Sequence, residues 1–202
     1  MLGDTQTTTR RRSYARQRIL DCAYELFSRR GIRAVGIDEL IASADVAKAT
    51  FYHHFHSKDD LVLAFLEQRE QVWTKGWVET EARKRGKTPQ EHLLAIFDLF
   101  DEWFRRDDFE GCSFVNVLLE FGGRDGHRLG QASAVYLENI RSVVRTLAEE
   151  ADLRDPAAFA LSWHILMKGS IVQAAEGDRE AAKRAQSMGR LLIDQHRLVE
   201  RP

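Results

Sequence analysis

The stretch from Gly31 to Leu61 constrains the fold of this 202-residue chain more than any other, because it reads as two short helices joined by a tight turn. Apolar residues spaced i, i+3, i+4 and i+7 form one side of the first helix: Ile37, Leu40, Ile41 and Ala44. The second helix, about 48–55, places Phe51 and Phe55 four residues apart on its inner side. A helix this short is unstable alone, so its neighbours must hold it while its polar side faces solvent. A helix-turn-helix presents a recognition helix to the major groove of DNA in this way.

A specific resemblance rests on the same residues. The segment KATFYHHFHSKDDL at 48–61 resembles the DNA-binding domain of the TetR/AcrR family of bacterial transcriptional regulators, and Tyr-x-His-Phe-x-Ser-Lys at 52–58 is its most specific part. The resemblance covers about 16–66, roughly a quarter of the chain. Four residues before this segment also match the family's spacing: Ala34, Leu40, Ala44 and Val46.

Three positions depart from the family pattern. Gly36 stands where the family usually has a Thr that caps the first short helix, Asp45 replaces a turn Gly, and Ala47 replaces a Ser that caps the recognition helix. No core residue is lost, so we expect the fold to be kept.

The resemblance implies the organisation and the function of the whole chain. We expect an all-α fold of about nine helices, with a flexible basic arm at 1–13, a three-helix helix-turn-helix domain at 14–60, and a helical domain at 61–202 that binds an effector and dimerises. The implied function is that of a ligand-responsive repressor, which a small-molecule inducer releases from a pseudo-palindromic operator. The implied partners are double-stranded DNA, an effector of unknown identity and a second copy of the chain.

The resemblance also assigns the residues that contact DNA. Base edges are approached by Lys48, Ala49, Thr50 and His53, and phosphates are contacted by Tyr52, His54 and Lys58. The charge run alone, and not the resemblance, suggests that Arg12 of the basic arm contacts the phosphate backbone or the minor groove, and a solubilising tail explains this run equally well. Taken singly, Lys48, Thr50, Tyr52 and Lys58 are each more often part of an ordinary solvated surface, but together in this motif they favour DNA contact.

The charge distribution supports DNA contact although the whole chain has a net charge of −1. Residues 1–58 contain 10 Lys or Arg and 6 Asp or Glu, whereas residues 59–202 contain 20 and 25. The positive excess therefore lies with the helix-turn-helix, where phosphate contact needs it.

Capping signals and apolar periods predict the other helices. Thr88-Pro89-Gln90-Glu91 is a capping box with Pro at the first helical position, and Asp155-Pro156 starts another helix in a similar way. Ser57 caps a long helix whose inward residues include Val72, and Ser13 caps a first helix from about Tyr14. The expected helices are about 14–30, 57–85, 89–104, 113–121, 127–151, 156–176 and 179–197, in addition to the two short ones.

A cavity for the effector is expected between the helices of the second domain. Its candidate residues are large apolar side chains with a few polar ones: Phe100, Trp103, Phe104, Phe114, Asn116, Glu120, Trp163, His164 and Met167. Plain core packing is the alternative for each apolar residue. Asn116, Glu120 and His164 are more informative, because burial without a partner costs about 1–3 kcal/mol each.

The two last helices are apolar on more than one side, which predicts a dimer interface. Pairing with their two-fold copies gives a four-helix bundle. The interface candidates are Leu161, Ile165, Gly169, Val172, Ala185, Met188 and Leu192.

The sequence gives little indication of metal binding, catalysis or redox sensing. His53, His54 and His56 lack a Cys or carboxylate that completes a zinc set, and the sequence contains no recognisable catalytic triad, P-loop, HExxH or GxGxxG. We therefore expect no metal, no cofactor and no catalytic residue, with a small helical enzyme as a remote alternative. A redox sensor acting through Cys112, near a predicted helix N-terminus, is the other alternative.

The compartment follows from what the sequence lacks. Two cysteines, Cys22 and Cys112, form no disulfide framework. No signal peptide opens the chain, and no apolar run approaches the ~20 residues that span a bilayer. We expect a cytoplasmic protein with reduced thiols and no membrane partner.

Overall fold

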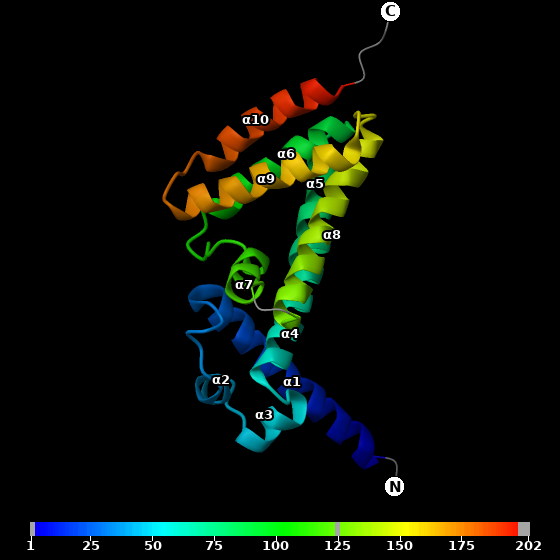
Figure 1. The fold of residues 1–202 in the computed structure, drawn as a ribbon. Helices are drawn as coiled ribbons and strands as arrows, with labels where there is room; N and C mark the ends of the chain where they lie inside the picture. The colour runs from blue at the N-terminus through cyan, green and yellow to red at the C-terminus, as the bar shows by residue number, and fades with distance from the viewer. Residues whose placement is uncertain (1–2, 124–125, 198–202) are drawn as a thin grey trace, which may run out of the picture. The chain divides into compact units, whose positions relative to one another are not determined.

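The computed structural model describes residues 3–123 and 126–197, with side chains from Tyr14 onward (Figure 1). Its elements are α1 (Gly3–Arg30), α2 (Ile37–Ser43), α3 (Lys48–His54), α4 (Lys58–Arg69), η1 (Glu70–Glu79), α5 (Thr80–Arg85), α6 (Pro89–Phe104), α7 (Ser113–Phe121), α8 (Arg128–Glu150), α9 (Pro156–Ala175) and α10 (Ala181–His196). The described residues form nine helices when the continuous α4, η1 and α5 are counted as one. This confirms the predicted all-α fold. Among these residues, no helix is long and apolar enough to cross a membrane.

The chain divides into two compact units. The first comprises Met1–Gln68 and Asn116–Ser133, and the second comprises Arg69–Val115 and Ala134–Pro202. Helices α7 and α8 therefore each belong partly to both units. The predicted domains at 14–60 and 61–202 were defined by function and stay a prediction. The division into compact units differs from them, because it groups the end of α7 and the start of α8 with the helix-turn-helix.

The predicted start of the first helix is wrong. α1 begins at Gly3 and continues through Ser13, which therefore lies inside the helix and does not cap it. Nothing in 3–13 breaks a helix, because these residues include no Pro. The side chain of Arg12 lies outside the described residues.

The long helix from Lys58 to Arg85 is confirmed, but its middle is a π-helix. In η1 each N–H bonds five residues back, which changes the face that each side chain occupies. Glu70 and Thr74 are consequently buried, whereas Val72 is 56% exposed. The prediction that Val72 points inward is wrong for this reason.

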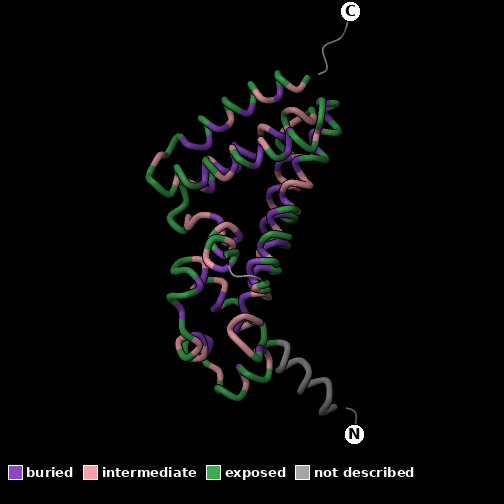
Figure 2. The backbone as a smooth tube through the Cα atoms, viewed as in Figure 1, coloured by how far each residue is buried: buried purple, intermediate pink, exposed green. Residues whose placement is uncertain are grey.

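The second unit is built on α6, α9 and α10, which lie side by side in Figure 1. Both predicted caps are present: Thr88 and Glu91 form the capping box of α6, and Asp155 accepts a hydrogen bond from the Ala158 N–H at the start of α9. Trp163 of α9 fills the centre, where its ring lies 5.1 Å from that of Phe97. Figure 2 shows the buried residues following the inner sides of these helices.

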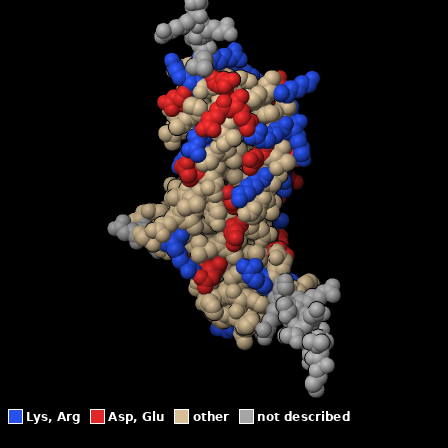
Figure 3. Space-filling view, turned by 90° about the vertical axis from the view of Figure 1, so that its right-hand side faces the viewer, with Lys and Arg blue, Asp and Glu red and all other residues tan. Residues whose placement is uncertain are grey.

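The surface carries both signs of charge. Figure 3 shows Lys and Arg interspersed with Asp and Glu on the face it draws. Two bidentate ion pairs link elements of the second unit: Arg83 with Glu150, at 2.7 and 2.8 Å, and Arg85 with Glu102, at 2.6 and 2.8 Å. Pairs this exposed contribute about 0–1 kcal/mol each to stability.

Candidate nucleic-acid interface and ligand cavity

The turn between α2 and α3 is held from outside by Arg18 of α1. Its guanidinium donates hydrogen bonds to the carbonyl oxygens of Ala44 and Asp45, at 2.5 and 3.1 Å, and pairs with the Asp45 carboxylate at 3.2 Å. Asp45 has a φ of 48°, in the left-handed region. Asp tolerates this conformation better than most residues other than Gly, so the turn forms although Gly is absent.

α3 presents a polar side because its two phenylalanines are buried. Phe51 and Phe55 are both buried, and Arg16 of α1 lies over the Phe55 ring at 5.2 Å from its centre. The helix starts without a side-chain cap, since Ala47 has no oxygen to offer. Packing, and not capping, therefore fixes its orientation.

The residues predicted to contact DNA lie together on α3 and at the start of α4. Four are exposed, namely Lys48, Ala49, Tyr52 and His53, and three are half-buried, namely Thr50, His54 and Lys58. Their contacts with DNA stay a prediction. Within the described part of the chain, no group of three or more potential His, Cys, Asp or Glu ligands comes together.

The start of α4 is tied to the start of α8. Ser57 accepts a hydrogen bond from the Asp60 N–H at 3.1 Å, and Arg128 of α8 pairs with the Asp60 carboxylate at 2.5 Å. The side-chain hydrogen bond from Arg128 holds the pKa of Asp60 below its usual value. Burial lowers the pKa of neighbouring Lys58, whereas Glu120 acts in the opposite direction.

Two candidate effector residues lie in the first unit. Glu120, near the end of α7, is ion-paired with Arg33 at 2.7 Å, and the Arg33 guanidinium also donates a hydrogen bond to the Glu120 carbonyl oxygen at 3.2 Å. The carboxylate contact is close but not aligned as a hydrogen bond. Asn116 is exposed. The structure therefore does not bring Asn116 and Glu120 to the cavity described below, because these side chains turn toward the first unit or toward solvent.

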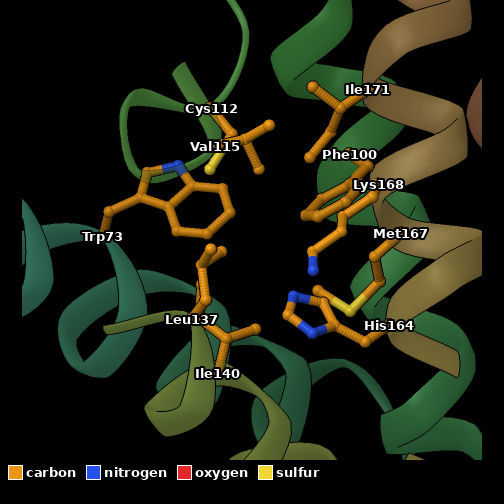
Figure 4. Close-up of a pocket in the computed structure, with 10 residues that line it drawn as sticks. All are labelled: Trp73, Phe100, Cys112, Val115, Leu137, Ile140, His164, Met167, Lys168 and Ile171. Atoms are coloured by element: carbon orange, nitrogen blue, oxygen red, sulfur yellow. The ribbon is translucent and has the colours of Figure 1, made fainter. Parts of the chain in front are cut away.

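A small cavity lies in the second unit (Figure 4). Its volume of about 10 Å³ holds about one water molecule. Phe100, His164 and Met167 line it as predicted. The other lining residues are Trp73, Cys112, Val115, Leu137, Ile140, Lys168 and Ile171.

The remaining candidate effector residues lie elsewhere in this unit. Trp103 and Phe114 border a second, narrower hollow that shares Trp73 and Cys112 with the cavity. Phe104 packs against Trp103, with ring centres 5.5 Å apart. Trp163 lies outside the cavity lining, since its ring fits against Gly189 of α10, where an added Cβ would approach it to 2.9 Å.

Sequence reasoning missed most of the cavity wall. Trp73 is not among the candidate effector residues, and the apolar residues of α8 carry no signal beyond ordinary core periodicity. Lys168 did carry one, because it is the only Lys, Arg, Asp or Glu in the largely apolar α9. Only the packing of α8 and η1 against α9 decides which of these residues meet.

His164 is a buried imidazole without a partner for one nitrogen. His164 is 4% exposed, and its Nδ1 has no hydrogen-bond partner among the described residues. Burial, followed by the positive charges of Lys168 and Arg141, lowers the pKa of His164 to about 3. The imidazole is therefore neutral at physiological pH.

The redox alternative finds no support at Cys112. The residue is buried, and burial raises the pKa of its thiol. A buried thiol with a raised pKa is a poor nucleophile, because the thiolate is the reactive form.

Most of the predicted interface residues form an exposed apolar surface on α9 and α10. Leu161, Ile165, Val172 and Met188 are exposed, as is Gly169. Ala185, by contrast, is buried within the unit and Leu192 is half-buried, whereas neighbouring Leu191 is exposed. We call Leu161, Ile165, Val172, Met188 and Leu191 the α9–α10 surface.

Comparisons with known proteins agree with this geometry. Residues 19–65 match the bacterial regulatory proteins of the tetR family. The chain is 26% identical over 170 residues to the transcriptional regulator AcuR of Cereibacter sphaeroides, covering 80% of this chain and 77% of that protein. It is 26% identical over 105 residues to the transcriptional repressor NemR of Escherichia coli, covering 52% of this chain and 53% of that protein. This second match thus spans about half the length of the relative.

One solved structure is similar over nearly its full length. A TetR-family transcriptional regulator from Streptomyces coelicolor superposes with a TM-score of 0.82 and 28% identity, covering 91% of this chain and 96% of that one.

The lowered pKa of His164 makes stability depend on pH. Between the ordinary value of 6.5 and the folded value of about 3, the unfolded chain binds the additional proton, so stability falls as pH is lowered through this range. In the His164→Gln variant this contribution is absent. We expect the free energy of unfolding of the native protein, relative to the variant, to fall by about 1.4 kcal/mol per pH unit between about pH 6 and pH 4.

Denaturant titrations at several pH values measure this difference. His56→Gln, which replaces an exposed histidine, is the control and should follow the native pH dependence. Parallel curves for the native protein and His164→Gln would contradict the assignment of a buried neutral imidazole.

Proposed function

Because the chain belongs to the TetR family of bacterial regulatory proteins, we propose that it is a transcriptional repressor that a small-molecule effector releases from its operator. One observation carries the proposal: the polar side of α3 is exposed while Phe51 and Phe55 anchor its other side. The residues named for DNA contact lie on that side. The similar proteins are named as transcription regulators, and we assign no catalytic residue.

The proposed operator is pseudo-palindromic because the proposed protein is a two-fold dimer. A dimer presents two recognition helices to successive major-groove faces, so the half-sites mirror the symmetry of the protein. The α9–α10 surface supports this assembly, since exposed apolar patches on a soluble chain commonly mark interaction sites. Its α9 members recur every four to seven residues along one side of the helix, as in a four-helix bundle.

The proposed link between effector and operator is α7. Its first three residues belong to the second unit, where Val115 lines the cavity, and the rest belongs to the first unit, where Glu120 pairs with Arg33. A ligand that enlarges the cavity displaces Val115, and a helix transmits such a displacement along its axis. We therefore assign Glu120 to the coupling of the two units and not to ligand contact.

Replacing lysines of the helix-turn-helix tests the DNA contact. We expect Lys58→Ala to weaken binding to all duplexes and to reduce the slope of log K against log salt by about 1, because one phosphate contact is lost. Lys48→Ala should instead relax sequence preference by about 1–3 kcal/mol at one base pair. Mobility-shift titrations with a genomic fragment library measure both effects.

Lys183→Ala, in α10, is the matched control and should bind the operator as the native chain does. Absence of any salt-sensitive duplex binding by the native protein would contradict the proposed function.

A charge on the α9–α10 surface tests the dimer. Ile165 is 71% exposed, so Ile165→Glu leaves the single chain folded but buries a carboxylate in the proposed interface. We expect this variant to sediment as a monomer at concentrations at which the native protein is a dimer. Leu119→Glu is the control, since Leu119 is 79% exposed and lies in α7, outside the α9–α10 surface. A native protein that sediments as a monomer at micromolar concentration contradicts the proposed dimer.

A double-mutant cycle tests the role of the ion pair between Arg33 and Glu120. If the pair orients the helix-turn-helix, Arg33→Met and Glu120→Gln should each weaken operator affinity, and the double variant should be no weaker than either single one. The expected coupling energy is about 0.5–1 kcal/mol. Operator affinities that add within about 0.3 kcal/mol would show that the two residues act independently.

A further inference from the structure

The cavity of the second unit has an unusual chemical composition. The ten side chains that line it contain no oxygen atom, so the cavity has no acidic or hydroxyl group. Its polar groups are the amine of Lys168, the imidazole of His164, the indole N–H of Trp73 and the thiol of Cys112. Figure 4 shows the nitrogens of Lys168 and His164 lying close together and directed into the cavity.

Each of the two side chains has a nitrogen without a partner among the described residues. His164 and Lys168 are four residues apart on α9, so they lie on one side of the helix. Among the described residues, no hydrogen bond or ion pair is formed by the half-buried amine of Lys168, and Nδ1 of the buried His164 has no partner. Native proteins rarely leave buried polar groups unpaired, because each costs about 1–3 kcal/mol.

Positive charges act on both of these side chains. Arg141 of α8 lowers the pKa of both His164 and Lys168, and burial is the larger cause in each case. Arg69 and Lys168 act in the same sense on the thiol of Cys112. Acidic groups are also present on these elements: Glu138 pairs with Arg141, and the buried Glu70 accepts a hydrogen bond from Asn139 at 2.9 Å through one oxygen, while its other oxygen has no partner among the described residues. Lys168 is the only charged side chain among the ten that line the cavity.

We propose that the effector of this protein is a small monocarboxylate with an apolar body, whose carboxylate binds between Lys168 and His164. The inference rests on the proposed function, because it names the class of ligand for that effector cavity. A carboxylate supplies the acceptor oxygens that the wall lacks, and a charge-assisted hydrogen bond from an amine is among the stronger ones. One amine and a neutral imidazole offer too few donors for a phosphate dianion. The aromatic and aliphatic wall accommodates the rest of the molecule.

Binding requires a larger cavity than the present one. Trp73 and Cys112 line both the cavity and the narrower hollow bordered by Trp103 and Phe114, so we infer that a movement of the Trp73 indole enlarges the cavity toward that hollow. Trp73 belongs to η1, and π-helical segments are frequently found at functional sites. The ligand thus selects an expanded form of the second unit.

The test uses the purified full-length protein and two matched pairs of probes: benzoate with benzamide, and hexanoate with hexanamide. Titration calorimetry and thermal unfolding measure binding. We expect the acids to bind and to raise the melting temperature, and the amides to bind more weakly. Lys168→Met should reduce the affinity for the acids by about tenfold or more.

Two further variants make the result decisive. Lys168→Arg keeps the charge and should keep most of the affinity for the acids, which separates loss of the cation from misfolding. Lys75→Met makes the same change at an exposed lysine of η1 and should bind the acids as the native protein does. Equal binding of acids and amides, acid binding that Lys168→Met leaves unchanged, or no binding of either acid at millimolar concentration would overturn the proposal.

Operator mobility shifts with the same proteins separate this inference from the proposed function. If a neutral or cationic compound releases the operator and the acids do not bind, the repressor stands and the ligand class is wrong. If the acids bind through Lys168 without releasing the operator, the carboxylate site stands and the proposed release is wrong.

Discussion

The packing of Phe51 and Phe55 is the interaction on which the first unit depends. α3 has seven residues and no side-chain cap, so its own backbone hydrogen bonds cannot keep it helical. Burial of the two rings supplies the missing free energy, at about 1.5–3 kcal/mol for each fully buried side chain. The same burial fixes the rotation of the helix about its axis. Anchoring the apolar side therefore also determines which residues remain available to DNA.

Much of the fold was predictable because its signals are local. The capping box at Thr88 and the Asp155-Pro156 pair act within one turn of a helix, so sequence alone located the starts of α6 and α9. The π-helical turn of η1 has no such signal, and it reversed the expected orientation of Val72. The predicted start of α1 was wrong for a related reason. The residues 3–13 lack an apolar period, but this lack does not prevent a helix from extending through them.

The two candidate sites also differ in how well local sequence signals predict them. The residues of α3 named for DNA contact lie together because the motif is contiguous, and four of them are exposed, although their contacts with DNA stay a prediction. The cavity draws on η1, α6, α8 and α9, and the facing sides of separate helices are set by tertiary packing. Trp163 shows the difference, since its size and position suggested a ligand wall, but the absence of a side chain at Gly189 admits its ring to the core.

The composition of the cavity also bears on how an effector could act. A ligand shifts an equilibrium only by its difference in affinity for the two forms. The present cavity, at about 10 Å³, has no room for a carboxylate with an apolar body, so such a ligand would bind the expanded form alone. The whole binding free energy of the ligand then favours the expanded form. Part of this free energy comes from pairing Lys168, whose burial without a partner is unfavourable. Because Val115 of α7 belongs to the wall, expansion displaces it in the proposed mechanism, and Glu120 lies near the other end of the same helix. Unpaired polar groups in the contracted form thus increase the response to a ligand while reducing the stability of the free protein.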